Sequence, residues 1–381
     1  MALVAQCRAG FERETAIELR RLATAAKREI DVDATADRGF VVGNLGDFEP
    51  MRWQRALDRR QPIFVRTLFV GTGPHALLAA KGTRERPDRV APLTALIETF
   101  RNEIRLPGLA ARPERQPAYA SLRIEMPDTN EGKALSGLAR ALEPALATSL
   151  RSRGILPDAD AACHAMSAAA GANLHVFLVD GAHAYVGASV PPWASRWPMG
   201  IPRLRMPGAA PSRSTLKLAE AIITFLGDRE TALLRAGMRA VDLGAAPGGW
   251  TWQLAYRGLR VTAVDNGPLK GSVRDDPLVT HLRADGLSYV PKRPVDWMTC
   301  DIAEQPARIA TLVARWIGEG HARHAIFNLK LPMKKRYDEV DRCAAIIDSG
   351  LERSRVQHRF ALRQLYHDRE EVTGCVTALR T

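Results

Sequence analysis

The chain has 381 residues, of which 46% are hydrophobic and 25% charged, values that are ordinary for a soluble globular protein of two or three domains. It carries 54 Lys and Arg against 42 Asp and Glu, a formal net charge of +12. This balance favours polyanionic partners, nucleic acid first, although a compositional habit of using arginine would give the same charge. No apolar run approaches the length of a membrane span, which argues against a membrane protein.

The first part of the chain predicts a small α+β unit. Strands are expected over 2–7, 40–43 and 63–70, the last two because they are rich in β-branched and aromatic residues. A helix is expected over 11–25. The stretch 71–93 is rich in Gly, Pro and charge, and we interpret it as a connection.

A second small unit follows. Residues 118–125 alternate like a strand, 131–150 predict a helix, and 174–179 with 184–188 predict a hairpin. The proline-rich stretch 191–210 comes next, and we interpret it as the linker between domains.

From Pro211 onward strands and helices alternate, which predicts an α/β domain with a mostly parallel, Rossmann-like sheet. Ser212 or Ser214 is expected to cap a helix that runs to Phe225. The last two strands lie close together in sequence, so they should form an antiparallel pair at one side of the sheet, with one strand reversed. The strands of this domain are predicted over 239–243, 260–264, 279–283, 295–299, 324–329, 360–365 and 371–378.

The segment from Ala240 to Trp250 is the most informative part of the chain. An apolar strand ends in Asp242-Leu243, and the turn Gly244-Ala245-Ala246-Pro247-Gly248-Gly249 leads into a helix. Glycine lets a ligand lie directly on backbone, and such strand–turn–helix units bind nucleotide-like cofactors in open α/β sheets. The spacing is neither G-x-G-x-x-G nor a phosphate loop. It therefore points towards S-adenosylmethionine, which has no phosphate to bind; the alternative is an ordinary tight turn.

Acidic residues follow the next strands. Asp265 comes 21 residues after Gly244, a spacing at which an acid can accept hydrogen bonds from both hydroxyls of a ribose. Asp285 follows the third strand, where it could meet an adenine amino group. Each has a plain alternative as a solvated loop carboxylate. Asp301 follows the fourth strand and should face the ligand, because open α/β sheets bind at the carboxyl ends of their strands.

The acid at the end of the fourth strand has a cysteine beside it. Cys300 would be the nucleophile of a cytosine-C5 methylase, but side chains alternate along a strand, so Cys300 and Asp301 cannot both face the site. We expect Asp301 to face it and Cys300 to be a buried thiol. The Asn/Asp-Pro-Pro-aromatic motif of enzymes that methylate exocyclic amino groups is absent from this position.

Lys330 ends an apolar strand, an unusual place for a lysine. Burial disfavours the ammonium ion and lowers its pKa, so Lys330 is a candidate base. The alternative is a surface lysine that leads into Lys334-Lys335-Arg336. That basic cluster either binds phosphates or is a solvated helix start.

Cysteine usage predicts neither disulfides nor a metal site. The five cysteines (Cys7, Cys163, Cys300, Cys343 and Cys375) form no C-x-x-C pair and no zinc-like spacing with histidine. An odd, scattered set fits free thiols in a reducing cytosol, and the charged N-terminus does not look like a signal peptide. We therefore expect a cytoplasmic protein without a metal.

Lys217, in S-R-S-T-L-K-L, and Glu371, in L-Y-H-D-R-E-E-V, are unremarkable alone, and Glu370 competes with Glu371. With Asp301 and Lys330 they resemble the Lys-Asp-Lys-Glu tetrad of FtsJ-like RNA ribose 2′-O-methyltransferases. The segments F-N-L-K-L-P-M-K-K-R, C-R-A-G-F-E-R-E and M-P-D-T-N-E-G-K extend the likeness over nearly the whole chain. They resemble the RlmM family, which methylates a cytidine of bacterial large-subunit (23S) rRNA.

This resemblance assigns roles to the residues. Lys330 would accept the proton of a ribose 2′-hydroxyl, and Lys217, Asp301 and Glu371 would complete the tetrad. Ala246 stands where relatives often have cysteine, a change that should affect packing rather than chemistry. S-adenosylmethionine, with no metal, would be bound by Ser214, Gly244, Ala246, Pro247, Gly248, Gly249, Asp265, Asp285 and Asp301.

The resemblance also implies the domains and partners. Residues 1–75 would form a ferredoxin-like subdomain, 76–190 a THUMP RNA-binding domain, 191–210 a linker and 211–381 the methyltransferase. The expected partner is 23S rRNA or an early large-subunit assembly intermediate, bound by a monomer. Two alternatives stay open: base methylation with Cys300 as nucleophile, and a non-catalytic RNA-binding or ribosome-assembly factor.

Overall fold

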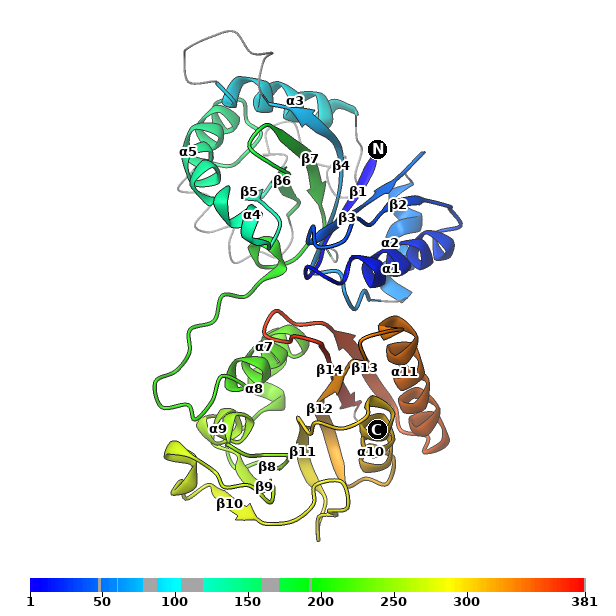
Figure 1. Cartoon of the computed structure of the whole chain (residues 1–381), viewed down its shortest axis with the longest axis vertical. Coiled ribbons are helices and arrows are strands. Elements are labelled where there is room, and N and C mark those ends of the chain that lie inside the picture. The colour runs from blue at the N-terminus through cyan, green and yellow to red at the C-terminus, as the bar shows by residue number, and fades with distance from the viewer. Residues whose placement is uncertain are drawn as a thin grey trace. The chain divides into compact units, whose positions relative to one another are not determined.

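The computed structural model describes residues 1–46, 49–59, 61–77, 88–103, 119–158, 171–191 and 194–379. The chain forms two compact units, Met1–Ile201 and Pro202–Thr381 (Figure 1). The boundary between them falls inside the proline-rich stretch 191–210. Of the segments interpreted from sequence, residues 78–87, 118 and 192–193 lie outside the described residues.

One seven-stranded sheet runs through the first unit, in the order β2-β3-β1-β4-β7-β6-β5. Neighbouring strands are antiparallel except β5 and β6, which are parallel. The strands are β1 (Ala2–Gln6), β2 (Asp31–Asp33), β3 (Phe40–Asn44), β4 (Thr67–Ala76), β5 (Ser121–Glu125), β6 (Asn173–Leu178) and β7 (His183–Ser189). The helices are α1 (Glu12–Ala25), α2 (Pro50–Arg59), α3 (Val90–Glu103), α4 (Asn130–Ala134) and α5 (Ser136–Ser152).

Both faces of this sheet are apolar. Side chains alternate along a strand, so Leu3 of β1 joins the core under the helices, whereas Val4 joins a cluster on the other face. That second cluster is aromatic, and it contains Phe40, Phe69 and Phe177. The strand predicted over 2–7 and the helix over 11–25 are confirmed, as is the hairpin of β6 and β7.

The strand predicted over 63–70 begins later, at Thr67. The reason is the buried carboxylate of Glu18 in α1, which accepts the backbone N–H groups of Ile63 (2.5 Å), Phe64 (2.8 Å) and Val65 (3.2 Å). These donors therefore do not enter a β-ladder. The apolar composition of the segment reflects burial, and its hydrogen bonds go to a side chain.

The interpretation of 71–93 as a connection is wrong at both ends, because β4 continues to Ala76 and α3 begins at Val90. Gly71 lies opposite Gly187 of β7. A Cβ atom at Gly71 would lie 2.3 Å from the carbonyl oxygen of Val186. Gly71 thus marks the close approach of two strands, although the composition of the segment is typical of a loop.

The helix predicted over 131–150 is two helices, α4 and α5. Thr129 caps α4 by accepting the backbone N–H of Gly132 at 3.0 Å. The helix is interrupted at Leu135, and α5 begins at the next residue. The short strand β2 and the helix α2 were not predicted from the sequence.

The second unit is an α/β domain with strand order β10-β9-β8-β11-β12-β14-β13. Its strands are β8 (Arg239–Leu243), β9 (Arg260–Val264), β10 (Val279–Leu282), β11 (Val295–Cys300), β12 (Ala322–Lys330), β13 (His358–Arg363) and β14 (Glu371–Ala378). Strands β8 to β12 pair in parallel, and β14 is antiparallel to both β12 and β13. The predicted Rossmann-like sheet, with its one reversed strand and its final antiparallel pair at one edge, is confirmed.

Helices cover both faces of this sheet (Figure 1). On one face lie α7 (Thr215–Phe225), α8 (Glu230–Leu233) and α9 (Gly249–Tyr256), and on the other α10 (Pro306–Gly318) and α11 (Arg336–Arg353). Leu218 and Trp250 pack with Trp297 and Ile326 of the sheet in one core. Ser214 is the N-cap residue of α7, as expected, but its side chain makes no cap hydrogen bond; its hydroxyl lies 2.7 Å from that of Ser212.

The close approach of β4 and β7 gives a stability prediction. Gly71→Ala should destabilise the first unit by about 1–3 kcal/mol, because the new methyl group must displace backbone. Gly181→Ala is the matched control, since a Cβ there meets no atom within 4 Å. Urea unfolding of both variants measures the difference; equal stabilities would contradict the prediction.

Candidate active site

The glycine turn joins β8 to α9 at the carboxyl edge of the sheet. Gly244 (φ +75°) and Gly248 (φ +114°) have backbone conformations that favour glycine. Gly249 needs glycine for space: a Cβ there would lie 2.2 Å from the Ser214 hydroxyl oxygen. The predicted cofactor turn is therefore packed directly against the start of α7, which also brings Ser214 to it.

Asp242, the acid before the turn, faces inward. Its carboxylate accepts hydrogen bonds from Thr251 of α9 (2.7 Å) and Thr299 of β11 (2.9 Å). Burial raises the pKa of Asp242 to about 7. Asp242 therefore fixes the turn, the helix and the neighbouring strand to one another, and its side chain is turned away from any ligand on the turn.

Asp265 lies directly beside the turn. One carboxylate oxygen accepts the backbone N–H of Ala246 at 2.9 Å, and the other accepts that of Gly267 at 2.7 Å. The side chain is half-buried. An ionised carboxylate has about four acceptor positions, so Asp265 retains capacity for two hydroxyl donors.

Asp285 lies beyond the end of β10 and is exposed. Its carboxylate accepts the backbone N–H of Leu287 at 3.1 Å. The adjacent Gly286 is buried against the turn, since a Cβ there would lie 3.4 Å from the backbone nitrogen of Gly244. Asp285 thus stands at the same edge as Asp265, on the far side of the glycine turn from Ser214.

Four charged side chains meet beside this turn. Lys330 Nζ lies 2.5 Å from Asp301 Oδ1 and 3.0 Å from Glu371 Oε1. Lys217 Nζ lies 2.5 Å from Glu371 Oε2 and 3.7 Å from Asp301 Oδ2. The four side chains are between 14% and 26% exposed, so the cluster is largely desolvated but reachable from outside. The structure therefore brings together all four residues of the tetrad suggested by the sequence.

Strand register explains this convergence. Lys330 pairs with Glu371 across β12 and β14, and Asp301 directly follows Cys300, which pairs with Phe327. Lys217 reaches the group from α7, on the face of the sheet that this helix covers. Three strands and one helix therefore each supply one charge.

The sequence argument expected burial to lower the pKa of Lys330, and this is wrong. Burial does disfavour the ammonium ion, but the carboxylates of Asp301 and Glu371 outweigh it and raise the pKa of Lys330. In this arrangement Lys330 is a cation that donates hydrogen bonds to both acids. The Lys330 ammonium group must therefore lose a proton before it can accept one from a substrate.

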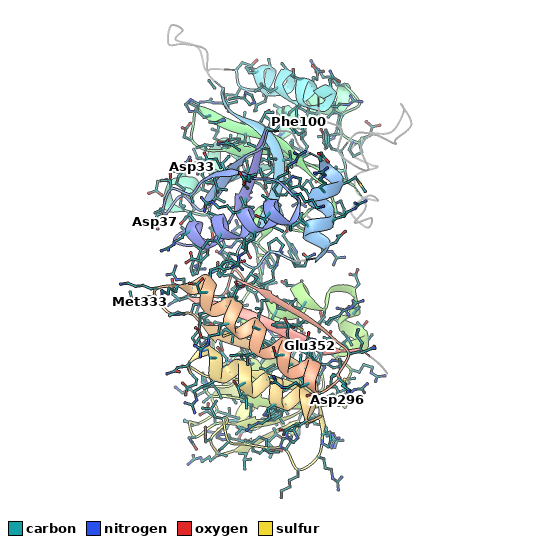
Figure 2. The ribbon with its side chains drawn as sticks, turned by 90° about the vertical axis from the view of Figure 1, so that its right-hand side faces the viewer. Asp33, Asp37, Phe100, Asp296, Met333 and Glu352 are labelled. Carbon is teal, nitrogen blue, oxygen red and sulfur yellow. The ribbon has the colours of Figure 1, made fainter. Side chains whose placement is uncertain are left out.

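Glu370 and Glu371 are separated by the structure. Glu371 contacts both lysines, whereas the exposed Glu370 pairs with Arg336 at 2.7 Å. Arg336 belongs to the basic cluster of residues 334–336. The loop that leads to this cluster from β12 carries Met333, which is 93% exposed and projects outward (Figure 2).

Cys300 is fully buried, and burial raises the pKa of its thiol to about 12. A nucleophile must be a thiolate that substrate can reach. Cys300 is therefore the inert core thiol that strand alternation predicted.

Sequence reasoning missed the polar residues that support the tetrad. Asn328 and Thr373 are fully buried beside it. Glu220 in α7 accepts the backbone N–H groups of Tyr366 (2.8 Å) and His367 (2.9 Å), which ties the segment ahead of Glu371 to the helix of Lys217. The available signal was an asparagine inside an apolar strand, two positions before Lys330.

Among the described residues, no group of three or more His, Cys, Asp or Glu side chains could hold a metal ion. Over the same part of the chain, no helix has the length and apolarity needed to cross a membrane.

A Rossmann-like sheet with one reversed strand, a glycine turn at its carboxyl edge and a Lys-Asp-Lys-Glu cluster beside that turn define a methyltransferase of the FtsJ-like class. The FtsJ-like methyltransferase model matches residues 210–355. Two further models match the first unit: the RlmM ferredoxin-like domain over 1–69, and the N-terminal region of ribosomal RNA large subunit methyltransferase M over 88–190.

Curated relatives of the chain carry the name ribosomal RNA large subunit methyltransferase M, among them the following three. The protein of Methylococcus capsulatus is 44% identical over 374 residues, 98% of this chain and 97% of its own length. That of Azoarcus sp. is 44% identical over 98% of this chain and 95% of its own, and that of Xylella fastidiosa 43% identical over 97% of each. The chain belongs to the ribosomal RNA large subunit methyltransferase M family. It is an S-adenosylmethionine-dependent methyltransferase, as the glycine turn led us to expect.

The position of Asp265 gives a binding prediction. Asp265→Ala should weaken S-adenosylmethionine binding roughly 10- to 100-fold, because it removes charge-assisted hydrogen bonds and the anchor of the Ala246 backbone. Isothermal titration with the full chain measures the Kd. Asp275→Ala, at an exposed acid on the surface, is the control and should bind as wild type does. Equal affinity of the two variants would exclude Asp265 from the cofactor site.

Proposed function

We propose that this protein transfers a methyl group from S-adenosylmethionine to the ribose 2′-hydroxyl of a cytidine in large-subunit (23S) rRNA. The observation that carries the proposal is the meeting of Lys217, Asp301, Lys330 and Glu371 beside the glycine turn. The substrate class is taken from the names of relatives that match nearly the full chain.

The tetrad suits a weakly acidic hydroxyl. Methylation of an alcohol needs a group that removes its proton and positive charge that stabilises the developing alkoxide. Lys217 supplies that charge. Neither a reachable thiolate nor the motif of amino-group methylation is found at the end of β11, so base methylation has less support.

Lys330 would act as the proton acceptor in two proton-transfer steps. Its ammonium group would pass a proton to Asp301 or Glu371, the two carboxylates within 3.0 Å, and would then take the 2′-hydroxyl proton. The net change is one proton moved from the hydroxyl to the tetrad. Lys217 stays charged beside Glu371 and holds that acid in place.

S-adenosylmethionine supplies a methyl group already activated by its sulfonium. Asp265 would hold the ribose hydroxyls, Asp285 the adenine amino group, and Ser214, Asp301 and the turn over 244–249 the remainder of the cofactor. These residues lie at the same sheet edge as the tetrad, so they would orient donor and acceptor in line. Such orientation supplies a large share of the rate enhancement.

The first unit would bind the RNA. We assign residues 1–75 to a ferredoxin-like subdomain, 76–190 to a THUMP RNA-binding domain, 191–210 to the linker and 211–381 to the methyltransferase. The net charge of +12 favours a polyanion. The protein would act in the cytoplasm as a monomer, on 23S rRNA or an early assembly intermediate.

Lys330→Ala should reduce methyl transfer by about 100-fold or more, since it removes the proton acceptor. The assay measures labelled methyl incorporated into unmodified large-subunit rRNA and maps it as an alkali-resistant linkage. Binding of S-adenosylmethionine should be retained, and Lys292→Ala, at an exposed lysine, should transfer normally. Label found in a base, or full activity of Lys330→Ala, would refute the proposed chemistry. If the wild-type protein bound RNA but transferred no methyl group, a non-catalytic assembly factor would be favoured.

Cys300→Ala should keep wild-type transfer to within about twofold, because the thiol is buried and protonated. The same transfer assay, with the folded fraction checked by thermal unfolding, measures this. Loss of activity in a folded Cys300→Ala variant would instead support base methylation with Cys300 as the nucleophile.

A further inference from the structure

Asn328 lies between the two acids of the tetrad. Its side-chain amide donates one hydrogen bond to Asp301 Oδ1 (3.1 Å) and one to Glu371 Oε2 (2.9 Å). Ionised carboxylates only accept hydrogen bonds, so the NH₂ end of the amide must face them. Both of its hydrogens are therefore used to hold the two acids.

The other end of the amide is held as well. Thr373, the cross-strand partner of Asn328, donates its hydroxyl proton to Asn328 Oδ1 at 2.7 Å. Because a hydroxyl can rotate to donate, it satisfies the carbonyl end of the amide. The contact fixes the rotation of the amide and so the direction of both N–H bonds.

Thr373 has one hydroxyl proton and a second hydrogen-bonding neighbour, Asp368 Oδ2, at 2.9 Å. Asp368 is fully buried, and burial raises its pKa to about 8, so at neutral pH it is mostly protonated. The single hydroxyl proton of Thr373 cannot serve both Asn328 and Asp368, so a protonated Asp368 would donate to Thr373 and leave the threonine proton for Asn328. The backbone N–H of Leu365 donates to the same Asp368 oxygen at 3.0 Å.

We infer that Asp368, Thr373 and Asn328 form a directional chain of hydrogen bonds, the positioning chain, that sets the orientation of Asp301 and Glu371. This inference rests on the proposed function, in which Asp301 and Glu371 take part in methyl transfer. Two acids that share two lysines have several nearly equivalent arrangements, because each ammonium can rotate and each carboxylate can swing. The amide of Asn328 selects one of them, because it donates to one fixed oxygen of each acid, Asp301 Oδ1 and Glu371 Oε2.

The positioning chain does not touch substrate. All three side chains are fully buried, behind the tetrad and away from solvent. Their loss should therefore lower the rate of the chemical step, leave RNA binding unchanged, and affect S-adenosylmethionine binding only through Asp301.

Thr373 offers a matched pair of variants. Thr373→Val keeps the shape of the side chain and removes the hydroxyl, whereas Thr373→Ser keeps the hydroxyl. Thr373→Val should lower kcat roughly 10- to 100-fold with KM for RNA unchanged within about twofold, the size expected when a catalytic group is displaced. Thr373→Ser should retain most of kcat. Calorimetric titration with S-adenosylmethionine gives the folded, binding-competent fraction of each variant, by which kcat is corrected.

The corrected kcat decides the inference. A wild-type value for Thr373→Val, or the same loss in Thr373→Ser and Thr373→Val, would overturn the positioning chain. Asn328→Asp provides a second route if either variant folds poorly: it replaces the two N–H donors by a third carboxylate and should lose at least as much kcat.

Failure of the proposed function would look different. The ratio of variant to wild-type kcat tests the positioning chain whatever atom receives the methyl group. The map of the methylated position in wild-type product tests the proposed 2′-O chemistry alone.

Discussion

The antiparallel pairing of β12 with β14 is the interaction on which the site depends. In a parallel sheet every strand ends at the same edge, so the first residue of a strand lies at the opposite edge from the site. Because β14 runs in reverse, its first residue, Glu371, lies beside Lys330 at the end of β12. The same ladder places Thr373 beside Asn328. A parallel last strand would leave the tetrad without its second acid.

Charge balance follows from this geometry. Two lysines and two acids in a partly buried cluster offset one another, which limits the cost of removing four charges from water. The consequence is that Lys330 is held as a cation by Asp301 and Glu371. In the proposed mechanism, the hydroxyl proton therefore ends on the cluster as a whole, with Lys330 as the group that takes it. The sequence argument considered burial alone and reached the opposite sign for the pKa of Lys330.

Local chemistry made much of the second unit predictable. Most of its strands are short apolar runs, although β13 is half polar and begins two residues before the predicted 360–365, and Gly244 to Gly249 follow the first strand. The first unit was harder, because a side chain replaces a strand partner at Ile63 to Val65 and glycines lie inside paired strands at Gly71 and Gly187. Both effects depend on contacts between distant segments, which spacing along the chain does not encode.

The tetrad could be predicted from the sequence only through family resemblance, because nothing in the residues around Lys217 and Glu371 distinguishes them from ordinary surface residues. The choice between Glu370 and Glu371 needed the register of β14, which turns one acid inward and leaves the other with Arg336. Asn328 gave a local signal, a polar residue in an apolar strand, but its function becomes visible only when both acids are placed around it.

The contact between α7 and the glycine turn has a mechanical consequence. Thr215 donates a hydrogen bond to the carbonyl oxygen of Gly249 at 3.0 Å, and Gly249 has no room for a side chain against Ser214. Lys217 comes half a helical turn later on the same rigid element. A displacement of α7 would therefore move Gly249 of the proposed cofactor turn together with Lys217 of the tetrad, so the two parts of the proposed site are coupled through one helix.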